Sequence, residues 1–114
     1  MKKVLFIGDV NVDIIMAGLA SPVQVNKEIF CTSFAVEMGS SAGIAAATYS
    51  HLANQPETVF FHGLAGRDDY GRFMVEGYAS HGIDTRYICR SDTVKTGVTV
   101  NLVHGRARSQ VTYP

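Results

Sequence analysis

Apolar and polar residues follow two different spacings along this chain, and each spacing predicts a different element. The continuous apolar run within 3–8 is typical of a strand that is buried on both faces of a parallel sheet. Gly8 and Asp9 interrupt the run, and alternating apolar residues resume over 10–15. A mixed segment over 28–38 then indicates an exposed or edge β-segment.

A helix is expected directly after this β-segment. Ser40 and Ser41 are both good N-caps, and the residues that follow recur at helical spacing with small alanines on the inner side. The tripeptide Asn54-Gln55-Pro56 predicts the end of this helix. The β-rich run over 58–64 indicates a second parallel strand.

A second helix and a hairpin follow. Asp68 or Asp69 is expected to cap the helix, and Gly82 suits the position just beyond its last turn. Residues 86–90 form a short strand candidate, and the alternation over 96–113, broken by a central turn, is typical of a β-hairpin. The order of elements predicts an α/β fold with a doubly wound, mostly parallel sheet that is incomplete as it stands.

The composition narrows the possible partners. The 114 residues suit one small domain, and ten basic residues balance ten acidic ones, which argues against nucleic-acid or anionic-membrane binding. Hydrophobic residues make up 46% and charged ones 18%, so a packed core is favoured over disorder. We find no transmembrane stretch, and the first apolar run ends too early for an export signal, so a cytoplasmic location is expected.

Cysteines and histidines do not indicate a metal site. Cys31 and Cys89 lack the spacing of a metal site or a redox pair, and free thiols are the simplest interpretation, although a disulfide between them stays open. The four histidines are scattered without the intervals of metal ligands.

Asn11 and Asp13 are the first candidate binding residues. They follow the first strand, at the edge where open α/β sheets bind ligands, and their separation places both on one face of an extended segment. An amide beside a carboxylate can hold two neighbouring hydroxyl groups. The alternative is that both residues cap a turn, a common role of Asn and Asp.

The start of the first helix is the second candidate site. Free N–H groups and the helix dipole favour an anion or a hydroxyl there, and Gly39 allows a ligand to approach the backbone. A plain capped helix start is the alternative. The sequence contains neither a P-loop nor the glycine fingerprint of a dinucleotide-binding fold.

Six segments, taken together and in order, resemble the N-terminal part of the ribokinase-like (phosphofructokinase-B type) sugar kinases. They are GDVNVD (8–13), MGSSAGIAAA (38–47), GLAGRDDYG (63–71), HGIDT (81–85), TGVTVNLV (96–103) and GRARSQVTYP (105–114). The resemblance implies an α/β sandwich with a small β-sheet lid, formed here by about 14–38 and 96–113. It makes residues 1–114 the N-terminal fragment of one kinase domain.

The resemblance also implies a set of substrate-binding residues: Asn11, Asp13, Gly39, Ser40, Ser41, Gly43 and Arg108. The match of Arg108, a residue of the lid, is looser than the others. The family's usual glycine pair is Met38-Gly39 in this chain, and Gly43 stands where the family usually has an asparagine. This last departure removes one expected contact with a substrate hydroxyl.

The Gly-Ala-Gly-Asp motif that carries the family's catalytic Asp is absent from this sequence. The resemblance therefore implies that this Asp, the ATP site and the residues that organise Mg²⁺ lie in a C-terminal half. The chain is then expected to be the substrate-binding portion of an ATP-dependent sugar kinase and to be inactive alone. The alternatives are a nucleoside kinase of the same fold and a non-catalytic sugar-binding or oligomerisation module, and exposed lid strands would allow a homodimer.

Overall fold

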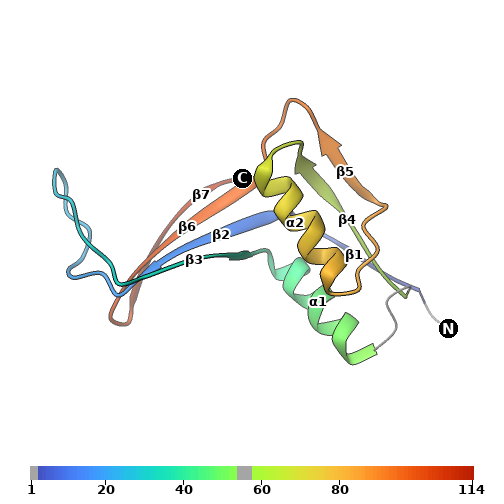
Figure 1. Ribbon diagram of the computed structural model, residues 1–114, viewed down its shortest axis with the longest axis horizontal. Helices are drawn as coiled ribbons and strands as arrows, with labels where there is room; N and C mark the ends of the chain where they lie inside the picture. Colours follow the sequence, from blue (N-terminus) through green and yellow to red (C-terminus); the bar gives the residue numbers. More distant parts are fainter. Residues whose placement is uncertain (1–2, 54–57) are drawn as a thin grey trace.

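The computed structural model describes residues 3–53 and 58–114 (Figure 1). The expected end of the first helix, Asn54-Gln55-Pro56, lies outside the described residues. The elements are, in order, β1 (Val4–Ile7), β2 (Asn11–Ala17), β3 (Ser33–Met38), α1 (Ser41–Ala53), β4 (Val59–Gly66), α2 (Asp69–Ser80), β5 (Ile88–Ser91), β6 (Gly97–His104) and β7 (Ala107–Tyr113). They form two sheets, with strand orders β1-β4-β5 and β3-β2-β6-β7. The predicted α/β fold with a small second sheet is confirmed.

The three strands of the first sheet are parallel, as the sequence predicts. Phe6 on β1 lies beside Phe61 on β4, and these two rings contact Tyr49 of α1 and Tyr78 of α2 respectively. Both helices therefore cover the same face of this sheet. The opposite face of β1 is open, with Leu5 50% and Ile7 68% exposed. The prediction that β1 is buried on both faces is wrong for this chain, because no described element packs on that side.

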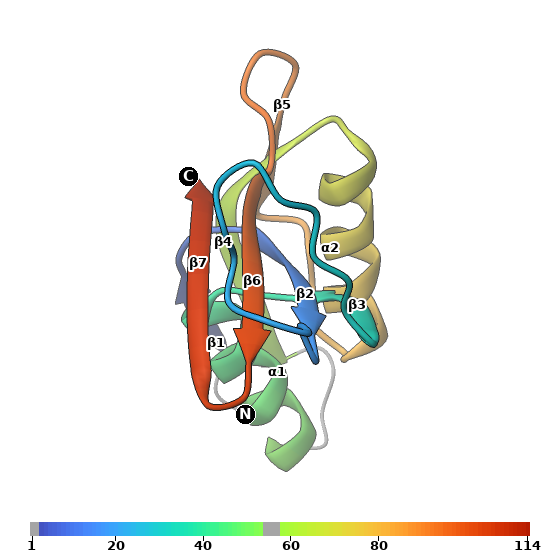
Figure 2. The ribbon, with the colours of Figure 1, turned by 90° about the vertical axis from the view of Figure 1, so that its left-hand side faces the viewer.

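The second sheet, which we call the lid sheet, extends away from the helices (Figures 1 and 2). Its central strands β2 and β6 are parallel, and each has an antiparallel neighbour, β3 and β7. The predicted hairpin is confirmed, and its turn contains Gly105 at a φ of 56°. Two predicted boundaries differ: β2 begins at Asn11, and β3 covers only 33–38 of the segment 28–38.

The predicted helix caps are confirmed. The Ser40 hydroxyl accepts a hydrogen bond from the Gly43 N–H at 3.1 Å, and α1 begins at the next residue, Ser41. Asp68 caps α2 and accepts from the Gly71 N–H at 2.7 Å. At the other end of α2, Gly82 has a φ of 78°, a left-handed conformation that suits glycine beyond a last helical turn.

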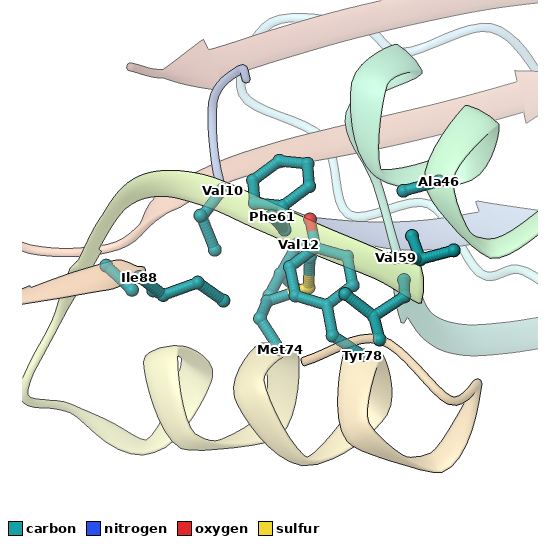
Figure 3. Packing of buried hydrophobic residues seen from close by; sticks show 10 residues of the cluster. Val10, Val12, Ala46, Val59, Phe61, Met74, Tyr78 and Ile88 are labelled. Atoms are coloured by element: carbon teal, nitrogen blue, oxygen red, sulfur yellow. The ribbon is translucent and has the colours of Figure 1, made fainter. Parts of the chain in front are cut away.

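One core joins the two sheets (Figure 3). It consists of Val10, Val12, Ala46, Val59, Phe61, Ala65, Met74, Tyr78, Ile83 and Ile88. The rings of Phe61 and Tyr78 stack, with centroids 4.7 Å apart and planes 24° apart. Tyr78 of α2 shares this core with Val12 of the lid sheet and Phe61 of the parallel sheet. The helix α2 therefore packs against both sheets.

The remaining sequence expectations concern thiols and membranes. Cys31 and Cys89 are free and exposed, so they form no disulfide with each other. Within the described part of the chain, every helix is too short or too polar to cross a bilayer.

A buried junction fixes the base of the lid sheet. Asp68 accepts hydrogen bonds from the Thr96 hydroxyl at 2.7 Å and from the Thr96 N–H at 2.9 Å, and the same hydroxyl accepts from the Gly66 N–H at 2.9 Å. A Cβ on Gly71 would meet the Gly66 carbonyl oxygen, so only glycine fits there. One carboxylate thus ties the start of α2 to the end of β4 and the start of β6.

Replacing Asp68 is expected to destabilise the protein. Asp68→Ala removes the helix cap and leaves buried Thr96 without its acceptor, which we expect to lower the free energy of unfolding by about 2–3 kcal/mol in urea denaturation at pH 7. Asp68→Asn keeps one acceptor oxygen and is expected to cost less. An equal loss in both variants would show that the second carboxylate oxygen is as important as the cap.

The wild type and Asp68→Asn also test how the stability of the protein depends on acid pH. Burial alone would raise the pKa of Asp68, but hydrogen bonds from Thr96 and Gly71, together with the charge of Arg90, outweigh it and hold the pKa below its ordinary value of 3.8. The ionised form is therefore favoured by folding, and its stabilisation is lost as pH falls below that value. Asp68→Asn should lose less stability on acidification than the wild type, because both proteins lose the contribution of Asp84 and only the wild type also loses that of Asp68.

Candidate functional site

Polar side chains gather on one face of the lid sheet. The register places Asp13 beside Glu37 on one side and Thr99 on the other, and Thr99 beside Thr112. Since alternate residues of a strand point to one face, the polar face comprises Asn11, Asp13, Glu37, Thr99, Asn101, Arg108, Gln110 and Thr112. Asn11 and Asp13 therefore share a face as predicted, but they belong to the lid sheet itself.

The amide of Asn11 is held in one orientation. Its Nδ2 group donates to the Thr99 hydroxyl at 3.2 Å and to Asp13 Oδ1 at 3.3 Å, and the side chain is 7% exposed. The Thr99 hydroxyl lies 3.0 Å from that of Thr112, which extends the network to β7. The amide oxygen of Asn11 faces Gly97, where a Cβ would come within 3.0 Å of it. A side chain at position 97 would therefore crowd this oxygen.

Gly39 brings the start of α1 against these two side chains. Its N–H donates to the Asn11 carbonyl at 2.8 Å. A Cβ on Gly39 would lie 2.8 Å from Asp13 Oδ1 and 2.9 Å from Asn11 Nδ2, so a larger residue would displace both groups. Ser40 follows with a φ of 73°, an uncommon value outside glycine, and turns the chain into α1.

The carboxyl group of Asp13 is surrounded by other charges. Burial raises its pKa above 3.8, the negative charges of Glu37 and Asp9 raise it further, and the guanidinium of Arg108 lowers it. Two neighbouring carboxylates thus oppose the ionisation of Asp13, and one cation of the lid favours it.

The structure brings together most of the predicted site residues. Asn11, Asp13, Gly39 and Ser40 are neighbours, and Ser41 is the exposed first residue of α1. Gly43 follows in the first turn of α1, where its N–H donates to the Ser40 hydroxyl. Gly43 is buried against Tyr78, and Arg108 lies farther out on the polar face, paired with Val103 near the tip of the hairpin.

The sequence prediction missed Glu37, Thr99 and Thr112. Thr99 stands in a segment whose alternation predicted a strand, but its partner Asn11 is 88 residues away in the sequence. Because nothing in the local pattern specifies which strands pair, the contact between them emerges only in the folded chain.

A hollow of about 310 Å³ adjoins these residues at the base of the lid sheet. Its lining includes Gly8, Asp9, Asn11, Gly97 and Thr112. A larger hollow of about 640 Å³ is lined by Asp68, Tyr70, Val98 and Tyr113, among others. Val98 and Tyr113 belong to the apolar face of the lid sheet. Asn11 and Thr112 of the polar face line the smaller hollow, whereas Asp13 and Gly39 do not. We therefore place the candidate site on the polar face around Asn11 and Asp13, beside the smaller hollow. Among residues 3–53 and 58–114, no group of three or more His, Cys, Asp or Glu could hold a metal ion.

Comparison with known proteins identifies the family. The sequence model of the pfkB family carbohydrate kinases matches residues 1–114. The chain belongs to this family. A search of curated proteins finds no match.

Solved structures of sugar kinases share the fold of this pfkB-family chain. A fructokinase from Xylella fastidiosa with bound ATP is 26% identical, with a TM-score of 0.77 over 99% of this chain and 33% of its own. A ribokinase from Giardia lamblia is 24% identical, with a TM-score of 0.82 over 98% of this chain and 33% of its own. A putative ribokinase from Agrobacterium tumefaciens is 18% identical, with a TM-score of 0.83 over 99% of this chain and 36% of its own. The chain spans about one third of the length of these kinases.

The charges around Asp13 give a test of the site geometry that does not depend on any ligand. We expect Glu37→Gln to lower the pKa of Asp13 and Arg108→Gln to raise it, because each variant removes one of the opposing charges. A ¹³C NMR titration of the Asp13 carboxyl group measures both shifts. Shifts of the same sign in the two variants would contradict the arrangement on the polar face.

Proposed function

We propose that this chain forms the substrate-binding portion of an ATP-dependent sugar kinase, which transfers the γ-phosphoryl group of ATP to a sugar hydroxyl. Membership of the pfkB family of carbohydrate kinases supports the reaction class. The observation that carries the assignment of the site is the Asn11–Asp13 pair, which is oriented by Thr99 and would be displaced by a side chain at Gly39.

The two side chains suit a sugar with neighbouring hydroxyl groups. The Asp13 carboxylate accepts a hydrogen bond from one hydroxyl, and the Asn11 amide oxygen accepts from the next. Phosphoryl transfer depends mainly on positioning and charge stabilisation, so holding the sugar in one orientation is the contribution we assign to these residues. The lid sheet would cover the bound sugar and exclude water that competes for ATP.

The described residues do not fit a nucleotide or Mg²⁺ site. They contain no P-loop and no cluster of three metal-ligating side chains. We therefore assign ATP, Mg²⁺ and the catalytic base to the part of the kinase that lies beyond these 114 residues. The open face of β1, with Leu5 and Ile7 exposed, supports the presence of further structure on that side.

The charges near the site favour a neutral sugar over a sugar acid. The negative charges of Glu37 and Asp9 act on Asp13, and the charge of Arg108 opposes them. Lys95 adds one positive charge in the adjoining hollow. Affinities for D-fructose, D-ribose, a 2-keto-3-deoxy sugar acid and adenosine, measured on the full-length protein, separate the sugar kinase from the nucleoside kinase. Preference for adenosine would favour the second.

The 114-residue chain by itself is expected to phosphorylate no sugar, because the proposed nucleotide site and base are absent from it. A coupled assay of ADP release with purified chain, ATP, Mg²⁺ and each sugar of the panel measures this. The full-length protein provides the positive control. Sugar-dependent ADP release from the 114-residue chain would contradict our assignment of the nucleotide site and the catalytic base to the rest of the kinase.

Asp13→Ala in the full-length protein is expected to weaken sugar binding about ten- to a few hundred-fold. Hydrogen bonds to a charged acceptor contribute roughly 1.5–3 kcal/mol, and 1.4 kcal/mol corresponds to a factor of ten. The affinity for ATP should hardly change. The control is Asp69→Ala, because Asp69 is an almost fully exposed carboxylate on α2.

Calorimetric titration with sugar and a thermal melt of the same Asp13→Ala protein separate the two interpretations of this residue. A binding role predicts weaker sugar affinity. The turn cap considered from the sequence does not apply, because Asp13 lies within β2 beside Glu37 and Thr99. A purely structural role in the lid sheet predicts a lower melting temperature with unchanged sugar affinity, and that result would remove Asp13 from the site.

A further inference from the structure

The hydroxyl group of Tyr78 is buried without a hydrogen-bond partner. The residue is 0% exposed, and its hydroxyl is the only buried side-chain nitrogen or oxygen atom among residues 3–53 and 58–114 that lacks one. Buried polar groups are almost always paired, since an unpaired one loses its bonds to water without replacement. An unpaired hydroxyl in the core therefore calls for a specific explanation.

This hydroxyl points at the first turn of α1. A Cβ on Gly43 would lie 2.5 Å from the Tyr78 hydroxyl oxygen, and 3.1 and 3.2 Å from Cε1 and Cζ of the ring. The tyrosine therefore occupies the space that a side chain at position 43 would take. Its ring is held there by stacking on Phe61. The hydroxyl thus reaches α1 from α2, across the core.

The same turn of α1 carries free hydrogen-bond donors. The Ser40 hydroxyl and carbonyl accept from the N–H groups of Gly43 and Ile44, at 3.1 and 3.0 Å. The N–H groups of Ser41 and Ala42 precede these and have no partner within the helix. Burial raises the pKa of Tyr78, and the negative charge of Asp9 adds to the shift, so the hydroxyl stays protonated and can donate.

We propose that Tyr78 is a substrate-binding residue whose hydroxyl donates a hydrogen bond to an oxygen atom of the sugar held by Asn11 and Asp13. The hydroxyl occupies the space that a side chain at Gly43 would take. The inference rests on the proposed function. Since Tyr78 is fully buried, the contact requires a local shift of the turn 39–42, in which Ser40 has the unfavourable φ of 73°.

Tyr78→Phe in the full-length protein tests the hydroxyl alone. The variant keeps the ring and its stacking on Phe61, so we expect the melting temperature to stay the same or to rise. The dissociation constant of the best-bound sugar, D-fructose or D-ribose, should rise roughly three- to tenfold, the range of one neutral hydrogen bond. Tyr70→Phe removes a partly exposed hydroxyl from the same helix and is the matched control.

A deoxy analogue of the same sugar identifies the contact. The analogue that lacks the hydroxyl bound by Tyr78 should bind the wild type as weakly as the full sugar binds Tyr78→Phe, and the variant should no longer distinguish the two. An unchanged sugar affinity of Tyr78→Phe would overturn the proposal and leave the hydroxyl a structural feature of the core.

A reciprocal exchange tests the link between Tyr78 and Gly43. Gly43→Asn alone should destabilise the protein, because its Cβ meets the Tyr78 hydroxyl. Tyr78→Leu alone should weaken sugar binding. The double variant returns a polar side chain to the same space from α1 and should recover much of both losses, a non-additive result. A double variant that binds sugar as weakly as Tyr78→Leu would contradict the exchange.

Asp13→Ala, measured in parallel, separates this inference from the proposed function. Weaker binding in Asp13→Ala combined with unchanged binding in Tyr78→Phe would overturn the role of Tyr78 only. Unchanged binding in both variants would overturn the sugar site as a whole.

Discussion

The stack of Tyr78 on Phe61 holds α2 against the parallel sheet, inside the core that also includes Val12 of the lid sheet. β1 and β2 are consecutive strands of different sheets, so the chain passes from one to the other within residues 8–10. α1 packs against β1 and β4 of the parallel sheet, whereas α2 packs against β4 of that sheet and against β2 of the lid sheet. α2 is therefore the helix that bridges the two sheets, and the stack of Tyr78 on Phe61 holds it to the parallel one.

Two sets of hydrogen bonds connect neighbouring elements in addition to this apolar contact. Asp68 ties the start of β6 to α2, and the Gly39 N–H ties the start of α1 to Asn11. These hydrogen bonds need defined distances and directions, so they form only when the connected elements are correctly placed. Both connections lie at the base of the lid sheet, where Asn11 and Thr99 are buried. The outer part of the sheet is less covered, with Phe34 63% and Val111 70% exposed.

The candidate site shows why a small residue can matter as much as a charged one. Gly39 keeps a side chain away from Asn11 and Asp13, and Gly43 leaves room for the hydroxyl of Tyr78. In both places the backbone of α1 is close enough to a polar side chain that a Cβ would displace it. The chemistry of the site therefore depends on where side chains are missing along the start of α1.

The sequence by itself determined the order of the elements and the residues that cap the helices. Ser40, Asp68 and Gly82 act locally, through hydrogen bonds or backbone conformations within one helical turn, so their roles were predictable. The common face of Asn11 and Asp13 was also predictable, because alternation along one strand places both residues on the same side. The resemblance to sugar kinases, carried by six short segments, also needed only the order of residues.

The tertiary structure alone decided which elements meet. Asn11 contacts Thr99 because β2 pairs with β6, and Gly43 meets Tyr78 because α1 and α2 cover the same face of the parallel sheet. The apolar run of β1 could not reveal that Leu5 and Ile7 remain exposed, since a hydrophobic pattern states what can be buried and not what covers it. Pairing and coverage depend on the packing of segments far apart in the chain, and no local spacing of residues records them.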